Sequence, residues 1–284
     1  MENNLSTSMY SGFSSLVNKH GPEYAAGFAS SSGFSSVEFI DIIGTGFTTF
    51  QNTDQALLAR RILHKHSLSV SCYSVGANLV NIESGVQKNS ETIETLKQIA
   101  EIAAALGSPY LHHTLFANLT LPHHAPSFDD VLYPVVEAAR EVADYCKGLG
   151  ISCIYENQGM YFNGVCNFNR FFQLMKTHCD NVGICGDIGN SLFVDEDPLP
   201  FFEAFIDHIK HVHLKDYEKV THTSALRSRE GIYLKDVPIG SGDIDIPSCL
   251  KALKKHGYCG AFSIEDEFIP ELPTTFSYLR EHFI

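Results

Sequence analysis

Short apolar segments alternate with longer segments of helical periodicity along the 284 residues of the chain. The apolar segments are short and rich in β-branched residues, which is typical of buried strands. Strands that are apolar on both faces and are separated by helices predict a parallel sheet covered by helices. The clearest of these segments are residues 36–42, 68–75, 109–116, 151–157, 182–188, 211–214 and 261–266.

The segments between the strands carry helical signals. Within residues 90–107, the apolar side chains recur at three- and four-residue steps, Ser90 can cap the start and Gly107 can end the helix. A weaker strand signal at residues 5–12 brings the number of strands to eight. We therefore expect a single (β/α)8 TIM barrel that forms one domain over residues 1–284. No glycine-rich phosphate loop follows the first strand, which disfavours an open doubly wound sheet.

Composition narrows the classes of function. The formal net charge of −13 disfavours a nucleic-acid binder, which needs a basic surface. No apolar run is long enough for a membrane span. The eight cysteines include no C-x-x-C pair, and the segment MENNLSTSMYSG lacks the basic and apolar regions of a signal peptide. We expect a reduced, cytoplasmic protein.

Four consecutive predicted strands end in residues that can bind a metal. Glu156, Asp187, His213 and Glu265 stand at or near the ends of the last four strands. In a parallel barrel the carboxyl ends of the strands meet at one rim, where active sites lie. One such residue alone means little, but four in succession predict a site for one divalent metal ion. The oxygen-rich set suits Mn²⁺, Mg²⁺, Co²⁺ or Zn²⁺.

The run IKHVHLKDYEKV places His211 and His213 on the same face of a strand, because alternate residues share a face. His213 lies closer to the carboxyl end and is the expected ligand. His211 would lie one layer deeper, either as a packed core residue or as a group that supports the ligand.

Several motifs in this order resemble the xylose isomerase-like TIM barrels, the sugar phosphate isomerase/epimerase group: IYEN, GDIGN, HVHLKD, IGSGDIDIP and GYCGAFSIEDE. The resemblance implies that Glu156, Asp187, His213 and Glu265 hold one divalent metal ion and that Glu156 and Glu265 act as the acid/base pair. It implies an isomerase or epimerase of a small ketose or ketose phosphate that acts through an enediolate. Relatives suggest a possible homo-oligomer, a dimer or a tetramer.

Two alternatives stay open. The same enediolate could expel a β-hydroxyl, which would make the protein a lyase that dehydrates a cyclic keto-polyol. The chain could also be a non-catalytic barrel that binds sugar or metal. An apurinic endonuclease is disfavoured, because Asn190 stands where many relatives have a histidine and an amide is a poor zinc ligand.

The residues expected to contact a small-molecule sugar are His113, Asn190, Lys215, Arg227 and Arg229. His112 and His113 alternate faces, so only one can point inward, and the resemblance favours His113. Basic residues cluster between positions 215 and 235 and could hold a phosphate or carboxylate of the substrate. The equal alternative is a solvated loop whose bases pair with neighbouring acids, and Lys215 is the member that a strand end would aim at the site.

Overall fold

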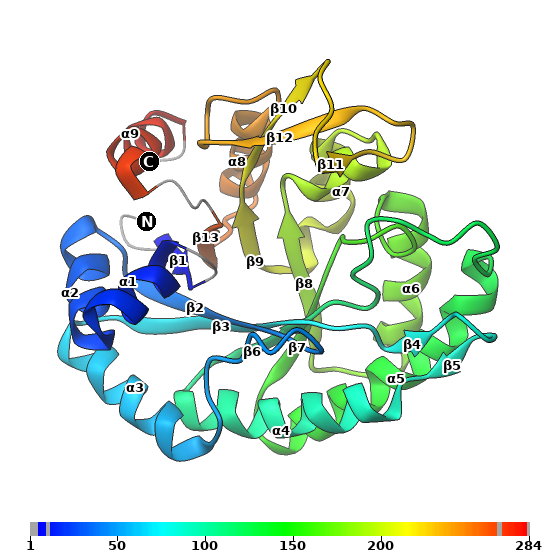
Figure 1. Cartoon of the computed structure of the whole chain (residues 1–284), viewed down its shortest axis with the longest axis horizontal. Coiled ribbons are helices and arrows are strands. Elements are labelled where there is room, and N and C mark those ends of the chain that lie inside the picture. Colours follow the sequence, from blue (N-terminus) through cyan, green and yellow to red (C-terminus); the bar gives the residue numbers. More distant parts are fainter. Residues whose placement is uncertain (1–4, 10–11, 266–268, 283–284) are drawn as a thin grey trace.

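Eight parallel strands close into a barrel in the computed structural model, which describes residues 5–9, 12–265 and 269–282. The strand order is β1-β13-β9-β8-β7-β6-β3-β2, with neighbours hydrogen-bonded in parallel (Figure 1). The barrel strands are β1 (Leu5–Ser8), β2 (Ser36–Ile42), β3 (Ser69–Gly76), β6 (Tyr110–His113), β7 (Ser152–Glu156), β8 (Val182–Asp187), β9 (Ile209–Leu214) and β13 (Ala261–Ile264).

Helices surround this barrel and complete the predicted (β/α)8 architecture (Figure 1). Residues 10, 11 and 266, which the predicted first and last strands included, lie outside the described residues. The helices are α1 (Gly12–His20), α2 (Pro22–Ser32), α3 (Thr53–Lys65), α4 (Ser90–Leu106), α5 (Phe128–Gly148), α6 (Val165–His178), α7 (Pro198–Phe205), α8 (Ile246–Lys255) and α9 (Leu272–His282), with short 3-10 turns η1 (Asn190–Val194), η2 (Ile206–His208) and η3 (Ile269–Glu271).

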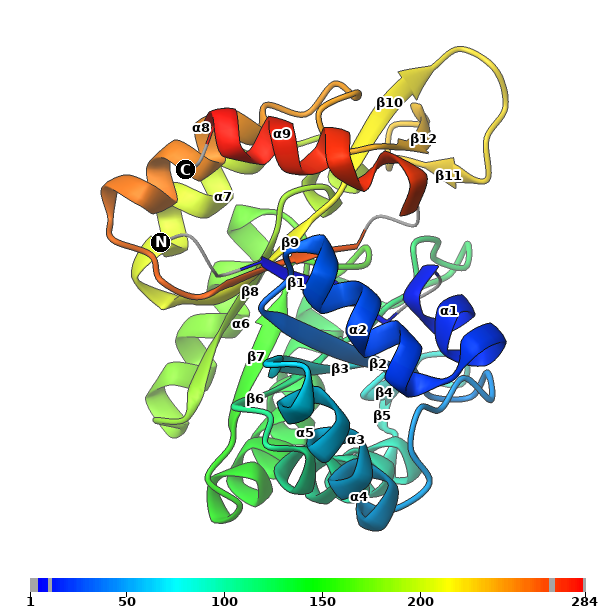
Figure 2. The ribbon, with the colours of Figure 1, turned by 90° about the vertical axis from the view of Figure 1, so that its left-hand side faces the viewer.

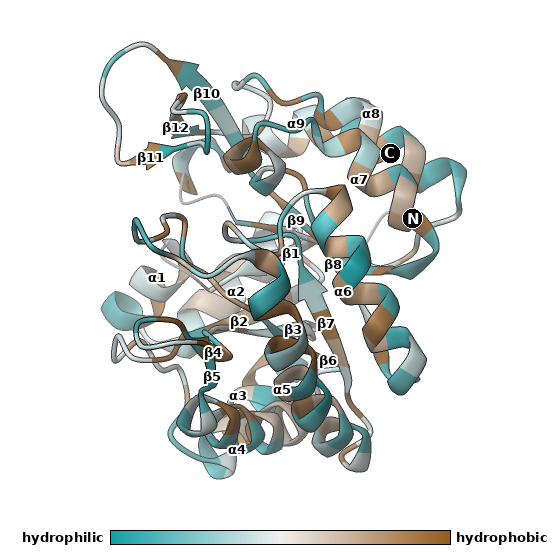
Figure 3. Ribbon diagram, turned by 90° about the vertical axis from the view of Figure 1, so that its right-hand side faces the viewer, coloured by the Kyte–Doolittle hydropathy of each residue, from teal (hydrophilic) through white to brown (hydrophobic). Residues whose placement is uncertain are grey.

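The helix α4 shows why these segments fold as they do. Its first turn is capped by Asn89, whose side chain accepts a hydrogen bond from the backbone N–H of Thr92, and not by the predicted Ser90. Gly107 ends the helix with a left-handed backbone, φ 85°. Its apolar face is buried against the barrel, including Ile93 and Leu96. Hydrophilic and hydrophobic residues alternate along such helices (Figure 3), as amphipathic elements require.

Two small sheets follow the carboxyl ends of barrel strands and lie on the same side of the barrel (Figure 2). A two-stranded antiparallel pair, β4 (Val80–Asn81) and β5 (Gln87–Lys88), follows β3. After β9, the chain forms an antiparallel sheet of β10 (Asp216–Val220), β12 (Tyr233–Val237) and β11 (Leu226–Arg227). The basic segment between residues 215 and 235, which the sequence left as a possible loop, therefore contains three short strands, and it lies at the rim where the site lies.

Inside the barrel, Cys72, Ile154 and Cys185 form a small apolar cluster with no solvent exposure. A much larger apolar core fills the layer between strands and helices. Within the described residues, no helix combines the length and the apolar character needed to cross a lipid bilayer.

Candidate metal centre and active site

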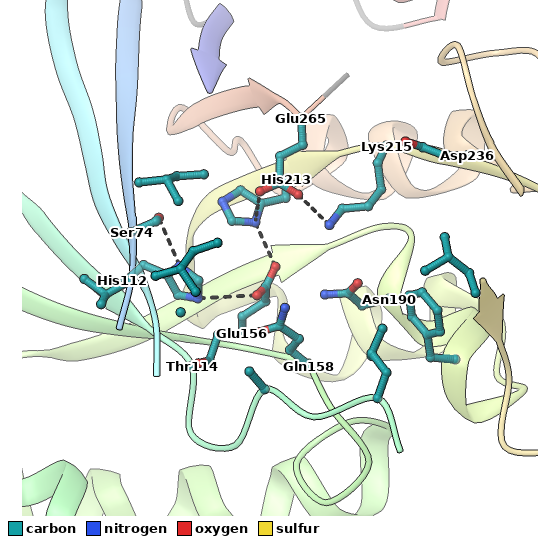
Figure 4. A pocket seen from close by; sticks show the side chains of 18 of the residues that line it. Ser74, His112, Thr114, Glu156, Gln158, Asn190, His213, Lys215, Asp236 and Glu265 are labelled. Atoms are coloured by element: carbon teal, nitrogen blue, oxygen red, sulfur yellow. Dashed lines mark hydrogen bonds and ion pairs between the residues drawn. The ribbon is translucent and has the colours of Figure 1, made fainter. Parts of the chain in front are cut away.

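Four side chains from four adjacent barrel strands converge at the carboxyl rim. Glu156 ends β7, Asp187 ends β8, His213 lies near the end of β9 and Glu265 directly follows β13. One potential ligand atom from each lies within 4.8 Å of the others. The Nδ1 atom of His213 is 2.8 Å from Oε1 of Glu156 and 3.4 Å from Oε1 of Glu265 (Figure 4). It is 3.7 Å from Oδ2 of Asp187. The structure thus brings together the four residues that the strand ends predicted.

The backbone fixes the orientation of the Asp187 carboxylate. Its Oδ1 atom accepts hydrogen bonds from the N–H groups of Gly189 and Asn190, both at 2.7 Å. Its own N–H donates to the side chain of Asn157 at 2.9 Å, which ties the end of β8 to the end of β7. Since Oδ1 is held by these donors, Oδ2 is the oxygen that faces the cluster. Burial raises the pKa of Asp187 to about 6, although Lys215 opposes this shift.

Lys215 reaches the cluster from the end of β9. Its Nζ atom lies 2.5 Å from Oε2 of Glu265 (Figure 4). The same atom lies 2.7 Å from Oδ2 of Asp187. Burial alone would lower the pKa of the ammonium, but these carboxylates hold it well above its usual range. A Cβ atom at position 189 would overlap the Lys215 side chain, so Gly189 is required for this close approach. Lys215 also lines the cavity that opens above the cluster, in line with its predicted place at the site.

A second layer of polar groups lies beneath the cluster. Glu38 of β2 is fully buried, and its carboxylate lies 2.9 Å from Nε2 of His213 and 2.9 Å from Nε2 of His211. The hydroxyl of Ser74 donates to the same carboxylate. Burial alone would raise the pKa of Glu38, but the two histidines hold it well below its usual range. His211 occupies the deeper position expected for it, and Glu38 is the partner that the prediction did not assign.

The prediction for His113 is wrong: His112, not His113, faces the cavity. Adjacent strand residues point to opposite faces, and β6 turns His112 inward, where its Nδ1 atom lies 3.0 Å from the hydroxyl of Ser74. His113 points toward the helices and packs edge-on against Tyr155 with 5.3 Å between ring centroids. Burial lowers the pKa of His113 to about 4, so this ring is neutral.

A cavity of about 380 Å³ opens above the cluster. Asn190 lines it, as predicted. The other polar side chains in its wall come from several strands and loops, and Figure 4 shows them directed toward the same space. They are Ser74, His112, Thr114, Glu156, Gln158, His213, Lys215, Asp236 and Glu265. The remaining wall is apolar and includes Ile40, Val75, Leu119, Phe193 and Leu226.

The structure does not place Arg227 and Arg229 in this cavity, contrary to their predicted role as substrate contacts. The guanidinium of Arg227 lies over the ring of Tyr233, 5.6 Å from its centroid. That of Arg229 donates to the backbone carbonyl of Met160 at 3.1 Å. Arg227 lies in β11, where it pairs with Tyr233 of β12, and Arg229 follows two residues after the end of that strand.

The residues of the cluster fit a divalent cation. Glu156 and Asp187 are almost fully buried, and Glu265 is 17 % exposed. Glu38 lies below them beside His211 and His213, so four carboxylates are buried close together, with the ammonium of Lys215 next to two of them. Buried negative charge in such excess is costly unless a cation compensates it. Three carboxylates and one imidazole nitrogen are a mostly oxygen donor set that suits Mn²⁺, Mg²⁺, Co²⁺ or Zn²⁺.

The closed parallel barrel and its cluster of acidic residues and histidine define a β/α barrel with a candidate metal centre. The family model of the xylose isomerase-like TIM barrel matches residues 26–282. The chain therefore belongs to this family.

Two curated relatives match part of the chain. Over 136 residues it is 33% identical to L-ribulose-5-phosphate 3-epimerase UlaE of Escherichia coli O1:K1 / APEC, covering 46% of this chain and 36% of that protein. Over 159 residues it is 28% identical to inosose dehydratase of Lacticaseibacillus casei, covering 53% of this chain and 52% of that protein. The matches thus span about half or less of the length of these relatives.

Solved structures share the fold. The crystal structure of D-allulose 3-epimerase from Methylomonas sp. in complex with D-allulose matches with a TM-score of 0.68 at 17% sequence identity. The match covers 93% of this chain and 84% of that one. At this identity the likeness establishes the barrel architecture and nothing about the reaction.

Proposed function

We propose that the protein is a divalent-metal-dependent isomerase or epimerase that acts on a small ketose through an enediolate. The observation that carries this proposal is the convergence of Glu156, Asp187, His213 and Glu265 at the floor of a cavity lined by hydrogen-bonding side chains. The matches to a ribulose-phosphate epimerase and to an inosose dehydratase support it, because both names describe chemistry next to a carbonyl.

The four clustered residues would hold the metal ion. When bound, a divalent cation would polarise the substrate carbonyl and stabilise the negative charge of the enediolate. Asp187 is held in place by backbone N–H groups, and His213 by Glu38, so both are oriented before a cation arrives. Lys215 bridges Asp187 and Glu265 and so favours their ionised forms.

Glu156 and Glu265 would move the proton. They come from β7 and the end of β13, and Figure 4 shows them approaching His213 from different directions. A sugar carbon between them could lose a proton to one carboxylate and regain one from the other, which inverts the carbon or shifts the carbonyl. His112, with Nε2 at 3.4 Å from Oε2 of Glu156, is placed to hold that carboxylate in position.

A dehydratase is the second candidate, favoured by the match to inosose dehydratase. The same enediolate would expel a hydroxyl from the next carbon instead of taking a proton back. Because the first step is common to both reactions, the residues assigned to the metal ion and to proton removal are the same.

Proton exchange tests the proposal. The metal-loaded protein is incubated in D₂O with a panel of ketoses and keto-polyols, and the sugars are examined by NMR. Deuterium at the carbon next to the carbonyl supports the proposal, and the products separate epimerase, isomerase and dehydratase. A sugar that binds without any exchange would instead support a non-catalytic binding barrel. The matched variants are Glu265→Gln at the site and Glu218→Gln on the exposed sheet.

A further inference from the structure

We propose that the cavity accepts an uncharged keto sugar or keto-polyol and discriminates against sugar phosphates. This inference rests on the proposed function, since it specifies the substrate class of the same site. It concerns the charge of the ligand, which the names of the relatives do not determine for this chain.

Among the described residues, the cavity wall holds no unpaired lysine or arginine side chain that could bind a phosphate. Among the described residues that line it, Lys215 is the only lysine or arginine. The residues outside the described part contain neither amino acid. The Lys215 ammonium lies within 2.7 Å of the Asp187 carboxylate and 2.5 Å of the Glu265 carboxylate. A phosphate would have to displace one of these carboxylates to obtain a direct cationic partner.

The site remains acidic even when a divalent cation is counted. Glu156 and Glu265 line the cavity, Asp187 lies beside them and Glu38 lies beneath. Against these four carboxylates stand one ammonium and the metal ion, which leaves one net negative charge. A phosphate ester would add a charge of about −1.5 to −2 at neutral pH. Like charges brought together in a poorly solvated site repel each other, whereas an uncharged sugar meets no such penalty.

Part of the backbone site that often binds phosphate in this architecture, the segment after the seventh strand, is filled by the protein itself. TIM barrels frequently hold phosphate at the loops after strands seven and eight, where N–H groups converge. After β9, the seventh barrel strand, the N–H groups of Gly240 and Gly242 donate to Oδ2 of Asp216 at 3.0 and 2.8 Å. The N–H of Tyr217 donates to Oδ1 at 2.9 Å.

Asp216 leaves no room for a second anion in this loop. Its side chain is 1% exposed, and the N–H of Ile244 also points at it, 3.4 Å from Oδ1. A Cβ atom at position 242 would overlap the Asp216 carboxylate, so the carboxylate packs directly against the backbone of the turn. The anion-binding donors of this loop are therefore committed to a carboxylate of the same chain.

Some uncharged polar atoms in the cavity wall have no hydrogen-bond partner in the protein, and sugar hydroxyls can supply one. Within the described residues, Nδ2 of Asn190 and Oε1 of Gln158 are buried and have no hydrogen-bond partner. Asn190 is only 3% exposed. An amide N–H₂ needs an acceptor and an amide oxygen needs a donor, and a hydroxyl group serves as both. These two atoms match a polyhydroxylated, neutral ligand.

Calorimetric binding to the Mn²⁺-loaded full chain tests the charge preference without relying on turnover. The ligands are matched pairs, L-ribulose with L-ribulose 5-phosphate and D-fructose with D-fructose 6-phosphate, titrated at low and high salt. We expect a free sugar to bind at least about tenfold more tightly than its phosphate, because of like-charge repulsion. Its affinity should not change with ionic strength. Asn190→Ala should weaken free-sugar binding by about three- to tenfold, and the exposed Asn169→Ala should not.

A phosphate that binds more tightly than its free sugar would overturn the inference, most clearly if Arg227→Ala/Arg229→Ala abolished that preference. Failure of every free sugar and phosphate to bind would overturn it as well. The proposed function fails separately: free sugars that bind selectively without deuterium exchange would leave the inference standing and remove the catalytic assignment.

Discussion

The Nε2 atom of His213 lies 2.9 Å from Oε1 of Glu38, while Nδ1 of the same ring lies 2.8 Å from Oε1 of Glu156. The ring therefore joins a carboxylate inside the barrel to the acidic cluster at its rim. An Nε2–H donated to Glu38 leaves the lone pair of Nδ1 for a cation. Partners of this kind fix the tautomer and orientation of a ligating histidine and raise its basicity.

Replacing Glu38 with glutamine should weaken metal binding. The amide keeps the size of the side chain but removes the charge that orients His213. We expect the affinity for Mn²⁺ to fall by about 10- to 100-fold. Titration of the metal-free protein, followed by calorimetry, measures this directly.

Asp41→Asn is the matched control for Glu38→Gln. Asp41 lies on the same strand, β2, and is also buried, but it bonds to Tyr73 at 2.9 Å and to the N–H of Thr49 at 2.6 Å. It stands three residues from Glu38 and so faces the other side of the strand. An equal loss of metal affinity in both variants would show that the effect of Glu38 comes from the fold and not from His213.

Glu265→Gln should suppress proton exchange. Glutamine cannot accept a proton from the substrate, and loss of a positioned acid or base typically costs about 10²- to 10⁴-fold in rate. Deuterium incorporation in D₂O measures the change at saturating Mn²⁺, so that weaker metal binding does not dominate the result. Exchange at the unaltered rate would remove Glu265 from the acid/base pair.

Asp216→Ala should destabilise the fold. Asp216 accepts hydrogen bonds from four backbone N–H groups. Three of them lie in the loop that follows β12, and the fourth is that of Tyr217 in its own strand β10. Leaving such donors buried without a partner costs about 1–3 kcal/mol. Urea unfolding measures the change in the free energy of unfolding.

Asp243→Ala is the control for that loop. Its exposed carboxylate accepts one backbone hydrogen bond, from Lys219 at 2.7 Å. We expect a change in unfolding free energy within about 0.5 kcal/mol. A loss as large as that of Asp216→Ala would mean that the loop is sensitive to any substitution and that Asp216 has no special part in holding it.

The barrel could be predicted from the sequence because most barrel strands are buried on both faces and helices such as α4 carry their own period and caps. Glu156, Asp187 and Glu265 could be located because they stand at strand ends, where parallel strands necessarily meet. His211 and His213 share a face of β9, and the position of His213 nearer the carboxyl end was enough to rank it above His211. These inferences need only local pattern and the closure of the barrel.

The features that the sequence left undecided depend on which side chains of a strand point into the barrel and on contacts between residues far apart in the chain. In β6, His112 and His113 are equally polar neighbours, and only the register with β3 and β7 determines which one points inward. The role of Glu38 requires contact with a histidine 175 residues away. Its signal in the sequence was a single carboxylate inside the apolar run SVEFIDI. The positions of Arg227 and Arg229 depend on the small sheet β10–β12–β11. Its strands are too short to produce a clear hydrophobic pattern in the sequence.

The metal content of the purified protein tests the central claim most directly. Protein prepared without added metal, and again after incubation with Mn²⁺ and removal of free ions, is analysed by elemental mass spectrometry beside an Asp187→Ala/His213→Ala variant. Circular dichroism confirms that the variant is folded. The account predicts about one divalent ion per chain, because one cluster of four possible ligands occurs among the described residues, and it predicts the loss of this ion in the variant. A folded protein that takes up no ion, or a variant that retains it, would contradict the assignment of Glu156, Asp187, His213 and Glu265 as a metal site.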